Sequence, residues 1–205
     1  MGDPRKLRKK YSTPTHPWQK LRIDEEKELM KSYGFKNKVE LWKLNSKLRN
    51  FKSQVKKLIP KKDEASQKQK QELIKRLQNM NLIGENAVAE NILEVTMIDM
   101  CERRLQTIVF KKGLGKSIKQ ARQFITHEHV IIGDRKVTSP SYLVTSGDEK
   151  TITFSKNSVL MSEDHPERVN KKAVPAKPVV EEAKEKPKTS KAPIKKETDD
   201  VVKDE

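Results

Sequence analysis

Cysteine, aromatic residues and long apolar runs are scarce in this chain of 205 residues. Its one cysteine, Cys101, excludes an internal disulfide and any zinc site built from several cysteines. No apolar run approaches the roughly 20 residues that cross a membrane, and the first residues lack the apolar core of a secretory signal. Apolar residues make up 33% and aromatic residues 5%, too little to bury the whole chain. We therefore expect a soluble, intracellular protein with a surface-bound or disordered segment.

Positive charge is abundant and unevenly distributed. The net charge is +16, and residues 1–62 alone carry 19 Lys and Arg against 6 Asp and Glu. Residues 63–101 are mildly acidic, residues 102–155 are basic, and residues 156–205 are nearly balanced. A highly charged solvated surface is the alternative explanation, but the first block far exceeds the roughly 2–8 charges that keep a small domain soluble. The basic blocks therefore predict a polyanionic partner, such as a phosphate backbone or an anionic membrane.

Residues 1–23 contain three prolines and no apolar period, so we expect an extended basic arm. Pro-X-X-Pro spacing is also typical of SH3 ligands. Aromatic rings between the cations suit RNA better, because rings stack on unpaired bases. The arm residues expected to contact RNA are Arg5, Lys6, Arg8, Lys9, Lys10, Tyr11, His16 and Trp18.

Residues 24–95 are predicted to form a small helical unit. Asp24 resembles an N-cap and Gly34 a helix end, and Asn37 with Glu40 has capping-box spacing at the start of a long helix that Pro60 ends. A third helix is expected over 63–80 and a short one over 86–93. The long helix carries an apolar stripe, Leu41, Leu44, Leu48, Phe51, Val55 and Leu58. Its other faces are basic, and their candidate RNA contacts are Arg49 and Lys52.

Residues 96–160 combine helices with short strands. Thr96 and Asp99 cap a helix that Gly113 ends, and Ser117 with Gln120 opens a second one. Strands follow at 130–132, near 137, at 142–144 and at 151–154, with turns at 133–134 and 147–148. We therefore expect an α+β chain: arm, helical unit, and a two-helix module with a small antiparallel sheet. Residues 161–205, rich in Lys, Glu, Pro and Ala, are predicted to be a disordered tail.

The module carries cations that we expect to converge on one groove of RNA. Lys119 and Arg122 are three residues apart and share one helical face. Arginine suits this role because its planar fork bonds two phosphate oxygens. Ordinary solvated charges are the alternative, and Lys111 and Lys112 also suit a helix C-terminus. The predicted contacts are Arg103, Arg104, Lys112, Lys116, Lys119, Arg122, Arg135 and Lys136.

No catalytic, cofactor or metal site is predicted. Residues 115–117 read Gly-Lys-Ser, but a phosphate-binding P-loop requires Gly where Phe110 stands and a preceding strand. His127 and His129 are two residues apart, whereas the zinc-protease motif spaces its histidines four apart on a helix. Cys101 lies on an apolar helical face and is expected to pack there.

A family resemblance rests on segments 102–109, 112–114, 120–123 and 137–140, together with arm motifs such as Lys9-Lys10-Tyr11 and His16-Pro17-Trp18. Over residues 1–160 the chain resembles the small-subunit ribosomal protein four family in its archaeal form, including its alpha-L RNA-binding module. Two positions depart from the pattern. Ile118 stands where the module family has Arg or Lys, which leaves Lys116 and Lys119 to replace that RNA contact. In the hairpin, Gly133-Asp134 stands where the archaeal form of the family tends to have Asp-Gly, and this order favours a type II′ turn.

The resemblance implies a cytoplasmic, non-enzymatic protein that binds small-subunit ribosomal RNA in its 5′ domain early in assembly. It also implies contact with small-subunit protein five near the path by which messenger RNA enters, and an influence on decoding accuracy. Two alternatives stay open. One is a ribosome-biogenesis factor absent from the mature subunit. The other is an RNA-modifying enzyme that uses the module for targeting, although 24–95 is short and basic for a cofactor-binding domain.

Overall fold

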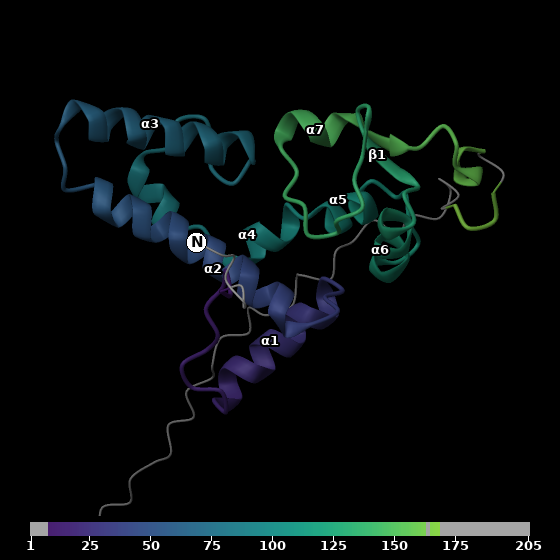
Figure 1. Cartoon of the computed structure of the whole chain (residues 1–205), viewed down its shortest axis with the longest axis horizontal. Coiled ribbons are helices and arrows are strands. Elements are labelled where there is room, and N and C mark those ends of the chain that lie inside the picture. Colours follow the sequence, from purple (N-terminus) through teal and green to yellow (C-terminus); the bar gives the residue numbers. More distant parts are fainter. Residues whose placement is uncertain (1–7, 163–164, 169–205) are drawn as a thin grey trace, which may run out of the picture. The chain divides into compact units, whose positions relative to one another are not determined.

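The computed structural model describes residues 8–162 and 165–168, which are drawn in colour in Figure 1. The architecture is α+β, with helices followed by a three-stranded antiparallel sheet, which confirms the predicted fold class. Among the described residues no helix is long and apolar enough to cross a membrane. The predicted tail, apart from 161–162 and 165–168, lies outside the described residues, as do Arg5 and Lys6.

Three helices form the first half: α1 (Lys20–Ser32), α2 (Lys38–Leu58) and α3 (Glu64–Asn79). The central helix α2 packs against α1 and α3 (Figure 1). Its predicted stripe is confirmed, since five of the six positions are buried and Leu58 is half-buried. A 3₁₀ helix, η1 (Ala89–Leu93), stands where a short helix was expected over 86–93, and it buries Ile92 in the same core.

The expected N-cap at Asp24 is wrong, because α1 begins one turn earlier with Gln19 as its N-cap. The guanidinium of Arg22 donates to the carbonyls of His16 (3.2 Å) and Pro17 (2.8 Å). These bonds hold the chain in a turn that leads directly into the helix, and Asp24 pairs with Lys27 on the helix surface.

The single helix expected from Thr96 to Gly113 is broken into α4 (Met97–Glu102) and α5 (Leu105–Lys111). The Thr96–Asp99 capping box is confirmed. The break follows from backbone competition. The amide of Val144 donates to Arg103 (2.9 Å), and the amide of Leu105 donates to Tyr142 (2.8 Å), so segment 142–144 takes bonds that a continuous helix would make. Segment 142–144 is accordingly not a strand; it forms one isolated bridge, Leu143 with Arg104.

The rest of the module is α6 (Ile118–Thr126), β1 (Val130–Ile132), β2 (Arg135–Lys136), α7 (Ser146–Thr151), β3 (Ile152–Phe154) and the 3₁₀ helix η2 (Val159–Met161). The strand order is β2-β1-β3, with Ile132 opposite both Arg135 and Ile152. The hairpin is confirmed as a two-residue loop with φ of +58° at Gly133, as a type II′ turn requires. The expected turn at 147–148 is wrong, because Thr145 caps α7 there by accepting from the Asp148 amide.

Two apolar cores support these halves. One is built around the apolar stripe of α2, and Cys101 is buried in it, as predicted. This burial raises the pKa of the Cys101 thiol to about 12. The second packs α5 and α6 on the inner face of the sheet through Ile108, Phe124 and Phe154. The tip of the α1–α2 turn meets the start of α6, and this junction positions the candidate site.

Candidate nucleic-acid interface

A groove of about 680 Å³ lies between the end of α1 and the start of α6. Its apolar part is formed by Met30, Phe35, Phe110 and Ile118. Five cations line the same groove, and no carboxylate does: Lys31, Lys36, Lys116, Lys119 and Arg122. A concave surface with charge of one sign concentrates the field, so it attracts an anionic ligand such as a phosphate backbone.

The start of α6 is set by local sequence chemistry. Gly113 adopts a φ of +70° after α5, and Ser117 accepts a hydrogen bond from the Gln120 amide (3.2 Å) as N-cap. The predicted capping box is only half formed. The side chain of Gln120 accepts a hydrogen bond from the amide of Lys116 (2.6 Å), whereas a complete box would use the amide of Ser117. The turn therefore fixes Lys116 and Lys119 on either side of the helix start.

Gln106 joins the two sides of the groove. Its buried amide donates to the carbonyls of Gly34 (3.2 Å) and Ile118 (3.0 Å). A Cβ at Gly34 would lie 2.6 Å from Cγ2 of Ile118. Ile118 therefore packs against the α1–α2 turn, which explains how an apolar side chain is accommodated at the position where the resemblance led us to expect Arg or Lys.

Replacing Gly34 by alanine should destabilise the fold by about 2–4 kcal/mol, because the left-handed backbone and the close contact with Ile118 both oppose a Cβ. Urea unfolding followed by circular dichroism measures the loss. Gly113→Ala is the matched control, since it has a similar φ of +70° but open space around it. Equal losses in the two variants would show that the Ile118 contact carries no weight.

A partly buried ion-pair cluster lies next to the groove. One oxygen of Glu40 (α2) accepts from Arg104 at 3.0 Å, and the carboxylate holds Arg122 (α6) through two bonds of 2.7 and 3.2 Å. Arg104 is fully buried and its guanidinium stacks 3.9 Å from the ring centre of Phe35. Burial raises the pKa of Glu40, but the hydrogen bonds and charges of the two arginines outweigh it and hold that pKa below its ordinary value.

This cluster corrects two predictions. Glu40 does not close a capping box with Asn37, which is the N-cap of α2 but makes no side-chain cap bond. Arg104 was expected to contact RNA, yet a fully buried guanidinium bonded to Glu40 cannot reach a phosphate. Arg103 is also buried, bonded to the Val144 carbonyl (3.2 Å) and to Glu149 (2.9 Å). Both arginines join parts of the fold, and neither belongs to the proposed RNA surface.

The other predicted residues of the module differ in their surroundings. Arg122 is partly exposed in the groove and paired with Glu40, and Lys119 is exposed there. Lys116 also lines the groove and is exposed, but its ammonium donates to the carbonyl of Pro166 (2.6 Å). Three further exposed cations have protein partners: Lys136 pairs with Glu128, Lys111 pairs with Glu102, and Lys112 donates to the carbonyl of Glu149. Arg135 is exposed on β2, away from the residues that line the groove. The groove therefore gathers only part of the set.

The arm and α2 carry the remaining predicted contacts. Arg49 is exposed and Lys52 is half-buried. Lys43 lies 5.9 Å from the ring centre of Tyr11, and the arm is tied to α2 where the Ser12 amide donates to Ser46 (3.0 Å). The predicted arm contacts that are exposed in the described residues are Arg8, Lys9, Lys10, His16 and Trp18.

Sequence reasoning missed Lys31 and Lys36, which face α6 across the groove. Lys31 had a local signal, as a cation in the last turn of α1. No local sequence signal indicates that these two lysines lie near Lys119, because that proximity depends on packing between segments about 80 residues apart.

Comparison with known proteins identifies the family of the chain. Residues 103–150 match the S4 domain family, so α5, α6 and most of the sheet belong to an S4 domain. The chain is 48% identical over 172 residues to small ribosomal subunit protein uS4 of Picrophilus torridus, with 82% of this chain and 94% of that protein covered. It is 46% identical to the uS4 proteins of Thermoplasma acidophilum (82% and 86% covered) and Methanococcus maripaludis (82% and 95% covered). The chain belongs to the uS4 family of small ribosomal subunit proteins.

Proposed function

We propose that this protein is a structural, non-enzymatic component of the small ribosomal subunit that binds small-subunit ribosomal RNA directly. The observation that carries the proposal is the groove between α1 and α6, which is lined by five cations and no carboxylate. Membership of the uS4 family supports the ribosomal setting.

In this proposal the groove receives the phosphate backbone of a folded RNA. Lys31 and Lys36 contact it from the α1 side, and Lys116 and Lys119 contact it from the α6 side. The apolar part of the groove provides a surface for sugar and base edges, which suits recognition by shape. The basic arm supplies further phosphate contacts along α2.

We place the RNA site in the 5′ domain of small-subunit ribosomal RNA, with binding early in the assembly of the subunit body. The same proposal includes a cytoplasmic location, contact with small-subunit protein five, proximity to the messenger RNA path and support of decoding accuracy. Crosslinking of RNA to the protein in cells, followed by sequencing of that RNA, tests the proposed RNA site. A dominant crosslink in the 5′ domain is expected, whereas crosslinks spread over transfer RNAs or messages would contradict it.

Quantifying the protein in salt-washed mature subunits separates a ribosomal protein from a biogenesis factor. One copy per subunit is expected. Absence from mature subunits together with presence in precursors would favour the biogenesis factor instead.

Replacing both Lys36 and Lys119 by glutamine should weaken binding to a 5′-domain transcript and reduce the slope of log affinity against log salt by about 2, because each lysine neutralises one phosphate. Filter binding over a salt series measures this. The matched control removes Lys27 and Lys68, two exposed lysines already paired with carboxylates on α1 and α3. An unchanged slope in the groove variant would contradict the proposed RNA surface.

A further inference from the structure

The folded chain holds one aromatic ring of the arm out into solvent. Trp18 is 90% exposed, the highest value among the exposed large apolar side chains of the described residues. With His16, Pro17 and Gln19 it lines a shallow depression of about 450 Å³. Tyr11 differs, because it is half-buried with the ammonium of Lys43 nearby. Of these two rings, Trp18 is therefore the one with its faces accessible.

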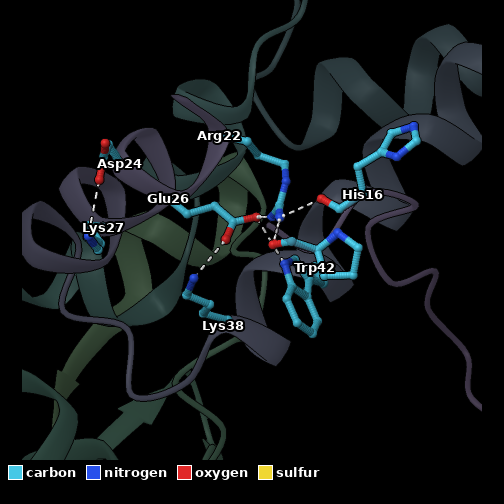
Figure 2. A network of polar contacts seen from close by, with 8 residues as sticks. His16, Arg22, Asp24, Glu26, Lys27, Lys38 and Trp42 are labelled. Atoms are coloured by element: carbon cyan, nitrogen blue, oxygen red, sulfur yellow. Dashed lines mark hydrogen bonds and ion pairs between the residues drawn. The ribbon is translucent and has the colours of Figure 1, made fainter. Parts of the chain in front are cut away.

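The backbone that carries Trp18 is clamped from α1. Figure 2 shows the guanidinium of Arg22 directed at the carbonyl of His16 and at Glu26. One terminal nitrogen of Arg22 donates to the carbonyls of His16 (3.2 Å) and Pro17 (2.8 Å), and the other bonds the Glu26 carboxylate. The terminal nitrogens of Arg22 thus bind this chain, and the two residues that precede Trp18 are fixed in place.

The anchor of this clamp is a buried carboxylate. Glu26 is 7% exposed, accepts from the indole nitrogen of Trp42 (3.1 Å) and lies 3.4 Å from the ammonium of Lys38 (Figure 2). Burying a carboxylate is unfavourable unless partners compensate for lost water. These partners belong to α1 and α2, so the network ties the arm to the helical core and fixes the rotamer of Arg22.

The charge of the segment that carries the ring favours an anionic partner. Segment 8–22 contains five cations and no Asp or Glu, and four of the five are exposed: Arg8, Lys9, Lys10 and Lys20. An exposed aromatic ring on a basic segment suits single-stranded nucleic acid, because bases stack on rings while cations bind the backbone. A backbone held in place before binding also reduces the conformational entropy that the segment loses when the ring binds.

We propose that Trp18 stacks on an unpaired base of the bound RNA, and that Arg22 and Glu26 are positioning residues that present it. The proposal deepens the proposed RNA-binding function and rests on it. In this proposal Arg22 bonds other parts of the protein and does not contact the RNA, although its charge alone would suggest a phosphate contact.

The first test compares full-length Trp18→Ala, Trp18→Phe and wild-type proteins in binding to a 5′-domain ribosomal RNA transcript. Trp18→Ala should weaken binding about 5- to 150-fold, because one stacked base contributes that much, and Trp18→Phe should restore most of the affinity. Leu21→Ala is the matched control, since Leu21 is 74% exposed three residues further on, and it should change affinity by less than about twofold.

The second test addresses the clamp. Arg22→Gln should weaken binding while leaving the salt slope unchanged, since Arg22 contacts no phosphate. In a Trp18→Ala background Arg22→Gln should cause little further loss, because both changes remove the same stacking contact. Lys27→Gln, on the same helix and exposed, is the control. A salt slope reduced by about 1 in Arg22→Gln would overturn the positioning role.

The outcomes separate the two proposals. Wild-type protein that fails to bind the transcript contradicts the proposed function itself. Tight wild-type binding with an unaffected Trp18→Ala variant overturns the stacking inference while the function stands. Normal transcript binding by Trp18→Ala combined with poor incorporation into subunits would also overturn it, and would assign the ring to a protein neighbour.

Discussion

Affinity for a small-subunit ribosomal RNA transcript should fall roughly 10³- to 10⁵-fold as salt rises from about 50 to 200 mM. This range applies if roughly 6–10 phosphates are neutralised, because each contact releases counterions from the RNA. Arg122 in the groove is already paired with Glu40, but the four groove lysines and the four exposed cations of segment 8–22 provide enough positive side chains for that number. Fluorescence anisotropy with labelled transcript over a salt series measures the slope.

Circular dichroism over the same salt range is the control, because the fold must stay intact for the slope to report on binding. A slope near zero would contradict recognition through phosphates and would leave the groove's charge unexplained. A slope that is unchanged after Lys36 and Lys119 are replaced would assign the phosphate contacts to other parts of the basic surface.

Replacing Glu40 by alanine should lower the free energy of unfolding by about 3–5 kcal/mol. The carboxylate is bonded to both Arg104 and Arg122, and Arg104 is fully buried. Without Glu40 the charge of Arg104 would remain buried beside the ring of Phe35 and would lose the carboxylate that compensates it. Urea unfolding of the variant and the wild type gives the difference directly.

Two further variants make this prediction specific. Glu64→Ala removes an exposed carboxylate that pairs with Lys68, and it should cost less than about 0.5 kcal/mol. A double variant, Glu40→Leu with Arg104→Met, removes the buried charge together with its partly buried partner and should recover most of the lost stability. If Glu40→Ala costs no more than Glu64→Ala, the buried cluster does not hold α2 to the S4 domain.

Much of the local structure follows from the sequence. The apolar stripe of α2, the Thr96–Asp99 capping box and the Gly133-Asp134 hairpin rest on residues close together in the chain. Such patterns report local geometry, so they can be read without knowing what lies nearby. Charge and composition also indicate an anionic partner, because net charge acts at long range and does not depend on the fold.

The roles of individual charges were decided by tertiary structure. Arg104 and Arg122 carry the same charge and stand 18 residues apart, yet Arg104 is fully buried while Arg122 reaches the groove. Their common partner, Glu40, lies 64 and 82 residues away. The helix break between α4 and α5 likewise depends on segment 142–144.

The sequence by itself determined the helices with strong apolar periods, the hairpin and the basic character of the surface. The tertiary structure alone decided which arginines are structural, which lysines line the groove, and that Arg22 holds the arm through Glu26. The physical reason is that burying a charge is unfavourable without a partner, and the partners come from distant segments that only folding brings together.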